Sequence, residues 1–170
     1  MKPRRVIDAV EVWRLTEQLF WLLSVATMAT IVVLANDWVH AVVGMTVGAA
    51  IGSVATMLGQ RENESRRNRL EPPPTFVADH DLPEVKPVWH SVVQRGLAFA
   101  AFASVASWLT LQDGGQVTLL VGYFVSTPVG ASVQYRHLLA RQESLGGTLW
   151  LSTRVAWRMK SRVSYVTFGC

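Results

Sequence analysis

The chain has 170 residues and a formal net charge of +4; half of its residues are hydrophobic and only 16% are charged. These values lie on the membrane side of the average for soluble domains. The single cysteine, Cys170, excludes an intramolecular disulfide and a cysteine-based metal site.

Four apolar stretches follow one another along the chain, at residues 18–36, 38–60, 88–112 and 114–135. A helix of about 20 apolar residues crosses the ~30 Å hydrocarbon core of a bilayer. Residues 1–17 are basic at their start and carry apolar residues at helical spacing, which predicts an interfacial helix that leads into the first span. The sequence therefore predicts an all-α integral membrane protein with four transmembrane helices.

Short polar turns divide the four stretches into two antiparallel hairpins, residues 18–60 and residues 91–137. The turns lie at Asn36-Asp37 and at Asp113-Gly114-Gly115. Residues 61–90 form a basic linker rich in proline, in which a helix could continue as far as Pro72. Pro128 predicts a kink in the fourth helix. Residues 138–170 form a basic, aromatic tail that we expect to be interfacial, as this composition suits the headgroup layer.

Small residues recur every fourth position in two of the predicted helices. This spacing places them on one face of each helix, and small residues allow the close backbone approach by which helices associate in lipid. We interpret them as two glycine zippers that pack against partner helices, in the same chain or in another copy. The zipper residues are Gly44, Gly48, Gly52, Gly122, Ser126 and Gly130.

The two zippers are separated by a constant interval along the chain, which suggests that the hairpins are duplicated. Gly44 and Gly122 are separated by this repeat interval, and Gly48 and Ser126 are separated by the same number of residues. The same interval places Glu17 and Arg95 at equivalent positions, at the start of the first and third spans. A charge near the bilayer is costly unless it is paired or reaches water. We therefore expect either an ion pair between these two side chains or two residues that reach the interface independently.

The 16 lysines and arginines fall in three segments: four in residues 1–14, six in residues 61–95 and six in residues 136–162. Since cytoplasmic loops collect lysine and arginine, this partition predicts a protein of the cytoplasmic (inner) membrane with both termini and the linker in the cytoplasm. The basic residues flank the spans, so we expect them to contact anionic lipid headgroups and not nucleic acid. The expected headgroup contacts are Arg4, Arg5, Arg154, Arg158, Lys160 and Arg162.

The sequence contains no zinc-protease, serine-hydrolase, nucleotide-binding or Cys-x-x-Cys motif. His90 and His137 are predicted near the same membrane face, but two histidines without a carboxylate or cysteine make a weak metal or haem site. We therefore expect no enzyme activity and no cofactor.

Three classes of function are compatible with these features. The first is a protein that self-associates through its zippers to form a pore, similar in architecture to the holins of bacteriophages, and the composition suggests a bacterial or phage genome. The second is an accessory or regulatory subunit that docks onto a larger membrane complex. The third, a small transporter, is the least favoured because the central parts of the four predicted spans contain no charged residue.

Overall fold

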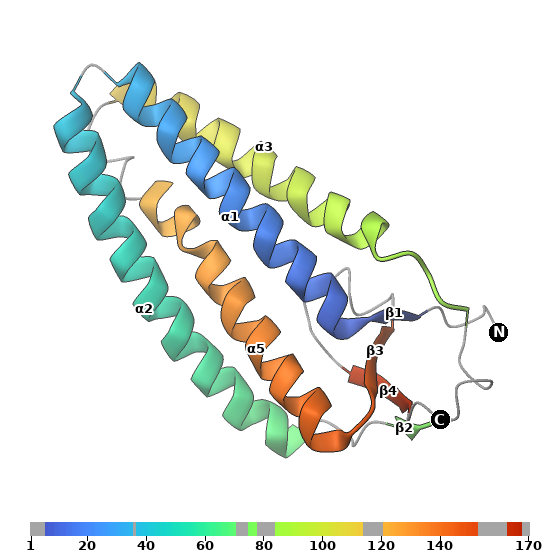
Figure 1. Cartoon of the computed structure of the whole chain (residues 1–170). Coiled ribbons are helices and arrows are strands. Elements are labelled where there is room, and N and C mark those ends of the chain that lie inside the picture. Colours follow the sequence, from blue (N-terminus) through green and yellow to red (C-terminus); the bar gives the residue numbers. More distant parts are fainter. Residues whose placement is uncertain are drawn as a thin grey trace.

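The computed structural model describes residues 6–35, 37–70, 75–77, 84–113, 121–152 and 163–167. Its helices are α1 (Ala9–Leu34), α2 (Trp38–Leu70), α3 (Trp89–Asp113) and α5 (Thr127–Leu145). They form an elongated bundle (Figure 1). The turn between α1 and α2 lies at one end, here called the turn end. A β-sheet lies at the other, which is called the sheet end.

Three of the described helices are long and apolar enough to cross a membrane, at Ala9–Leu34, Trp38–Gly59 and Trp89–Leu109. The predicted helical character is confirmed, and the three apolar helices suggest a membrane-embedded protein. The N-cap of α1 is Asp8, whose Oδ1 accepts a hydrogen bond from the backbone N–H of Glu11 at 2.9 Å. α1 starts well before the predicted first span, because the apolar spacing of residues 9–17 continues into that span.

α1 is the helix on which the bundle is assembled, since it contacts α5, α3 and α2. Its buried face follows a spacing of about four residues, as one face of a helix requires. In Figure 1 α5 lies between α1 and α2, while α3 lies on the other side of α1. α2 and α3, by contrast, make little contact within the described residues. The fully or nearly buried residues of α1 are Ala9, Val12, Thr16, Phe20, Ser24 and Ile31.

The fourth helical segment is broken in its middle. Residues 121–125 are helical, Ser126 is a turn, and α5 starts at Thr127. Pro128 has no N–H for the carbonyl four residues earlier, and the hydroxyl of Thr127 donates to that carbonyl of Phe124 instead, at 2.6 Å. The predicted kink near Pro128 is therefore present, and a neighbouring side chain satisfies the backbone group that the proline leaves without a donor. The glycines of the second predicted turn, at 114–115, lie outside the described residues.

The sheet end differs from the sequence-based expectation, because four short strands form a sheet there in the order β1-β3-β4-β2. The strands are β1 (Val6–Asp8), β2 (Thr75–Phe76), β3 (Thr148–Ser152) and β4 (Val163–Thr167). The expected interfacial helix over residues 1–17 is wrong at residues 6–8, where β1 pairs antiparallel with β3. Much of the described tail likewise belongs to this sheet, as its β-branched and aromatic residues favour strands.

The linker contributes to both sides of this sheet. β2 pairs parallel with β4, and residues 84–86 bond to Val6, whose N–H donates to Glu84 O at 3.1 Å and whose carbonyl accepts from Lys86 N at 2.8 Å. Gly146, at φ 64°, ends α5 in the left-handed conformation that glycine adopts without strain. It directs the chain from α5 into β3.

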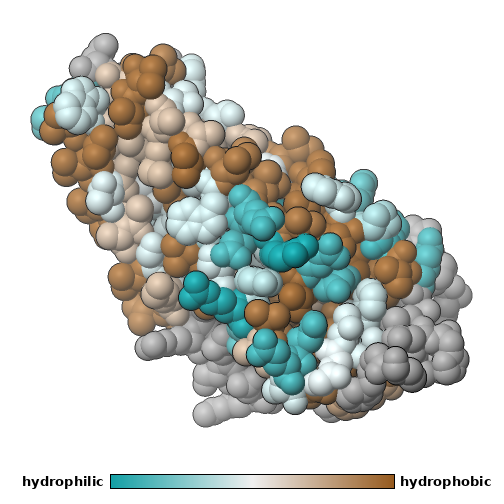
Figure 2. Space-filling model, viewed as in Figure 1, coloured by the Kyte–Doolittle hydropathy of each residue, from teal (hydrophilic) through white to brown (hydrophobic). Residues whose placement is uncertain are grey.

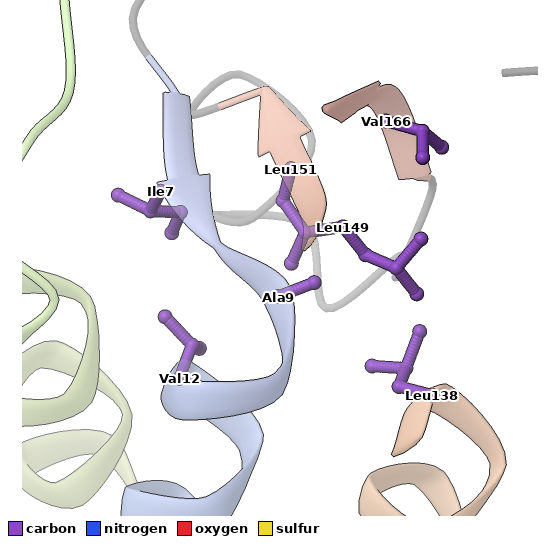
Figure 3. Close-up of a cluster of buried hydrophobic side chains, with 7 residues drawn as sticks. All are labelled: Ile7, Ala9, Val12, Leu138, Leu149, Leu151 and Val166. Carbon is purple, nitrogen blue, oxygen red and sulfur yellow. The ribbon is translucent and has the colours of Figure 1, made fainter. Parts of the chain in front are cut away.

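Two separate apolar clusters stabilise the two ends of the bundle. The sheet-end cluster joins the sheet to the first turns of α1 and to α5 (Figure 3). Its members are Ile7, Ala9, Val12, Leu138, Leu149, Leu151 and Val166. The turn-end cluster lies among α1, α2, α3 and the segment 121–125. Its members are Ile31, Ala41, Met45, Ala106, Val121 and Val125.

The outer surface is divided in the same way. In Figure 2 hydrophobic side chains predominate over the turn-end part of the bundle, whereas hydrophilic ones gather over the sheet-end halves of α1 and α5. On α3 two exposed tryptophans, Trp89 and Trp108, lie near opposite ends of the apolar stretch. At a rise of about 1.5 Å per residue they are about 28 Å apart along the helix. This distance matches the spacing of the aromatic belts at the two surfaces of a bilayer.

Candidate functional site

The two predicted zippers lie against each other inside one chain. A Cβ atom added to Gly122 would lie 2.9 Å from the Cα of Gly48 and 2.8 Å from the backbone nitrogen of Ala49, and it would also meet the carbonyl oxygen of Met45. These obstacles are backbone atoms of α2, which cannot rotate away. Gly122 is therefore needed for the close approach of the segment 121–125 to α2.

The next contact along this interface joins Gly52 to the break in the fourth helix. A Cβ atom on Gly52 would lie 3.0 Å from both the Cβ of Ser126 and the carbonyl oxygen of Tyr123, and it would meet the Ser126 hydroxyl. That hydroxyl donates to the Tyr123 carbonyl at 2.5 Å. Both Gly52 and Ser126 are buried, whereas Gly44 and Gly130 are half-buried. The zipper residues thus face a helix of their own chain at the centre of the interface.

The zipper residues that lie opposite each other in the structure are not the ones that the repeat interval makes equivalent; the two zippers are shifted by one helical turn. In the structure Gly122 lies against Gly48, and Ser126 lies against Gly52. The repeat interval instead makes Gly122 equivalent to Gly44, which is four positions earlier on α2. Since a helical turn is about 3.6 residues, α2 and the fourth helix are shifted by about one turn relative to the predicted equivalence.

Glu17 and Arg95 contact different partners, because adjacent α1 residues face different neighbouring helices. The hydroxyl of Ser132, on α5, donates to Glu17 Oε1 at 2.5 Å, and the indole Nε1 of Trp21 donates to the same Ser132 oxygen at 3.4 Å. Glu17 thus links α1 to α5. The Glu17–Arg95 ion pair stays a prediction.

Arg95 links α1 to α3. It is only 6% exposed, its Nη1 donates to Thr16 Oγ1 at 3.4 Å, and its guanidinium lies 4.5 Å from the ring centre of Trp13. A buried cation is costly unless donors, acceptors or an aromatic face compensate it. The Trp13 ring supplies part of this compensation. Together, Glu17 and Arg95 form a polar layer between the two apolar clusters.

Most hydroxyl groups on the apolar helices bond to their own helix. Thr27, Thr30 and Thr46 donate to the carbonyl four residues earlier, at 2.7 to 2.8 Å, and Ser104 and Ser107 do the same. This is the common local pattern for such residues in helices. These hydroxyls therefore do not require a polar partner outside their own helix.

The remaining predicted sites are the basic residues near the two ends of the chain and two histidines. Arg4, Arg5, Arg154, Arg158, Lys160 and Arg162 lie outside the described residues, so their expected lipid contacts stay a prediction. His90 is exposed and 3.5 Å from Gln94, while His137 is half-buried on α5. Within the described parts of the chain, no group of three His, Cys, Asp or Glu residues is placed to hold a metal ion.

Comparison with protein-family models, with curated proteins and with solved structures finds no match to this chain.

Proposed function

We propose that this chain is a non-enzymatic, multi-pass membrane protein that acts as an accessory or regulatory subunit of a larger membrane complex. In this proposal the helical bundle anchors the protein, and the sheet, together with the helix ends around it, is the surface presented to the partner. The observation that carries the proposal is the closure of the two zippers against each other within one chain. The small residues predicted to drive self-association are thereby used to build a single bundle.

The proposed arrangement in the membrane has four spans, the fourth of which includes residues 121–135, with both termini and the sheet on the cytoplasmic side of an inner membrane. Figure 1 supports this, because the fourth helical segment runs beside α1 and α2, and the first and last described elements, β1 and β4, lie at the sheet end. The distribution of lysine and arginine in the sequence also favours the cytoplasmic assignment of that end.

The proposed duplication of the hairpins has mixed support. Phe20 stacks on Phe99, with ring centres 4.9 Å apart, and Thr16 contacts Arg95, so residues separated by nearly the repeat interval are level on α1 and α3. The bundle nevertheless lacks the matching contacts of a twofold arrangement, as α1 packs along α5 while α2 and α3 are nearly separate in the described residues. If the two hairpins arose by duplication, the contacts between their helices have since diverged.

Photo-crosslinking from two similarly exposed valines tests the proposed function. A benzoylphenylalanine probe at Val85, beside the sheet and 53% exposed, is compared with the same probe at Val43, on α2 and 57% exposed. We expect the Val85 probe to give a discrete adduct with a different membrane-complex protein in the native host. We expect the Val43 probe to give no adduct between copies of the chain.

The competing proposal, a zipper-assembled pore, predicts the opposite results. Adducts between copies from Val43, together with depolarisation of bacteria on induced expression, would contradict the accessory-subunit proposal. Depolarisation by a zipper pore should be abolished by Gly48→Leu and retained by Gly59→Leu. Gly59 is the matched control, because a Cβ atom added there would meet no atom within 4 Å.

A further inference from the structure

Charged and aromatic side chains line the outer edge of the contact between α1 and α5, here called the α1–α5 seam. Figure 2 shows hydrophilic side chains gathered over the sheet-end halves of these two helices. On α1, Arg14 and Trp21 are exposed and Glu17 is half-buried. On α5, Ser132 is half-buried and Arg136 is exposed. Successive members on each helix are three or four positions apart, so they lie along one flank of that helix.

A single hydroxyl group in the seam joins a carboxylate to an indole. Ser132 donates to Glu17 Oε1 at 2.5 Å and accepts from Trp21 Nε1 at 3.4 Å. The carboxylate oxygen and the indole nitrogen therefore lie within about 6 Å of each other. Trp21 is nevertheless 43% exposed. A negative charge beside an exposed aromatic ring suits an ammonium group, which gains a charge-assisted hydrogen bond and a cation–π contact.

The arginines of the seam supply positive charge next to this carboxylate. Side chains on a helix are directed toward its N-terminus, and α1 and α5 run in opposite directions (Figure 1). Arg136 lies one turn beyond Ser132 on α5, so its side chain is directed back toward the level of Glu17. Arg14 lies 3.8 Å from Glu11, and both side chains are about half exposed. Because such surface pairs are weak, both arginines remain available to a phosphate group, which arginine binds through two hydrogen bonds.

The exposed surface of the bundle changes from polar to apolar at the level of the seam. On α1, the exposed Arg14 is followed toward the turn end by Leu22 and Val25, which are 68% and 56% exposed. On α3, at the level set by its hydrogen bond to α1, the exposed Gln94 is followed by Leu97, which is 65% exposed. In a bilayer such a boundary separates the lipid headgroups from the acyl chains.

We propose that the α1–α5 seam binds a zwitterionic aminophospholipid of the phosphatidylethanolamine class. The ammonium group binds between Glu17 and Trp21. The phosphate binds Arg136 and Arg14, and an acyl chain lies along the exposed apolar face of α1 that starts at Leu22. This site differs from the anionic-lipid contacts expected at the basic ends of the chain, because its carboxylate repels a lipid that lacks the ammonium group. It requires insertion into a bilayer, but not a role as an accessory subunit.

Native mass spectrometry of the full-length protein in detergent tests the site. Dioleoyl-phosphatidylethanolamine and dioleoyl-phosphatidylglycerol are titrated separately, since they share acyl chains and phosphate and only the first carries an ammonium group. We expect Glu17→Gln to weaken binding of phosphatidylethanolamine about tenfold, as loss of a charge-assisted hydrogen bond does, and not to weaken binding of phosphatidylglycerol. Glutamine keeps an oxygen that accepts from Ser132, so the substitution preserves the contact between the helices.

Glu143→Gln is the matched control, because Glu143 is an exposed carboxylate on α5 about 16 Å nearer the sheet end than Ser132. It should leave binding of both lipids unchanged. Arg136→Gln should weaken both lipids, since both carry a phosphate. Trp21→Leu gives a second measurement, because it leaves the Glu17 carboxylate in place and should still weaken phosphatidylethanolamine selectively.

Three results would overturn the proposal. The first is wild-type protein that binds no phosphatidylethanolamine. The second is Glu17→Gln protein that binds this lipid as tightly as the wild type does or that loses both lipids equally. The third is an equal loss of phosphatidylethanolamine binding in Glu143→Gln. None of these results depends on the photo-crosslinking experiment, so the lipid site and the accessory-subunit proposal can fail separately.

Discussion

The turn-end and sheet-end halves of the bundle are held together by different physical means. At the turn end, small residues bring helix backbones into contact around an apolar cluster. At the sheet end, polar side chains join the helices, and a sheet covers the cluster of leucine, isoleucine and valine side chains. This contrast is the one expected if the turn end lies in lipid and the sheet end in water. Backbone contact stabilises helices in lipid, whereas burial of large apolar side chains stabilises a structure against water.

The largest expected effect is on the sheet-end cluster. Leu149→Ala should lower the free energy of unfolding by about 2–5 kcal/mol, because Leu149 is fully buried and alanine leaves a cavity. Limited proteolysis should show faster cleavage near the sheet and unchanged protection of the turn-end helices. Equal loss of protection at both ends would show that the two halves unfold as one unit.

A second substitution tests the turn end separately. Gly122→Ala should destabilise the bundle by about 1–3 kcal/mol, since the added methyl group meets the α2 backbone. Unfolding in detergent micelles titrated with a denaturing detergent gives the measurement. Gly59→Ala is the control and should be neutral or slightly stabilising, as alanine is the better helix former. Equal effects at both glycines would remove the argument for close packing.

Double-mutant cycles measure the polar layer between the halves. Glu17→Gln and Ser132→Ala should show a coupling energy of about 1 kcal/mol, because Glu17 accepts a hydrogen bond from Ser132. Glu17→Gln and Arg95→Gln should be additive, since Glu17 accepts a hydrogen bond from Ser132 while Arg95 donates one to Thr16. A coupling confined to Glu17 and Arg95 would support the ion pair that the sequence predicts.

The smallest effect concerns the turn itself. Hydrogen bonds from the backbone N–H and the ring of His40 hold the pKa of Asp37 below its ordinary value of 3.8. A depressed carboxyl pKa stabilises the folded state above the unfolded pKa and ceases to do so as the pH falls through the folded value. Acidification through and below pH 3.8 should therefore fray the start of α2, as measured by hydrogen exchange. In Asp37→Asn this pH dependence should be absent.

The helical part of the fold could be predicted from the sequence because its signals are local. Uncharged apolar stretches define spans, and Pro128 fixes a break within a few residues. The contact between Gly48 and Gly122 could not be predicted from the sequence. A four-residue spacing identifies the face of a helix that packs, but not the helix that packs against it. The repeat interval between the zippers predicts which residues lie level with each other on α2 and the fourth helix. In the structure the two helices are shifted from this prediction by one turn.

The sheet cannot be predicted from the sequence, because its strands are short and come from distant parts of the chain. Val6–Asp8 follows helical spacing as well as strand spacing, and so short a segment cannot decide between them. Only the β-branched run at residues 163–167 carried a local strand signal. The charged residues of the polar layer can be predicted, because Glu17 and Arg95 stand out as charges at the ends of spans. Ser132 cannot be predicted as the partner of Glu17, because the sequence carries no signal for that contact.

The order of the strands in the sheet determines when the sheet can form during synthesis of the chain. The two central strands, β3 and β4, come from residues 148–152 and 163–167, whereas the strands that flank them come from residues 6–8 and 75–76. The flanking segments leave the ribosome long before they have anything to pair with. The sheet is therefore completed only after the fourth helical segment has been made, so that its formation marks a chain whose helices have all been synthesised.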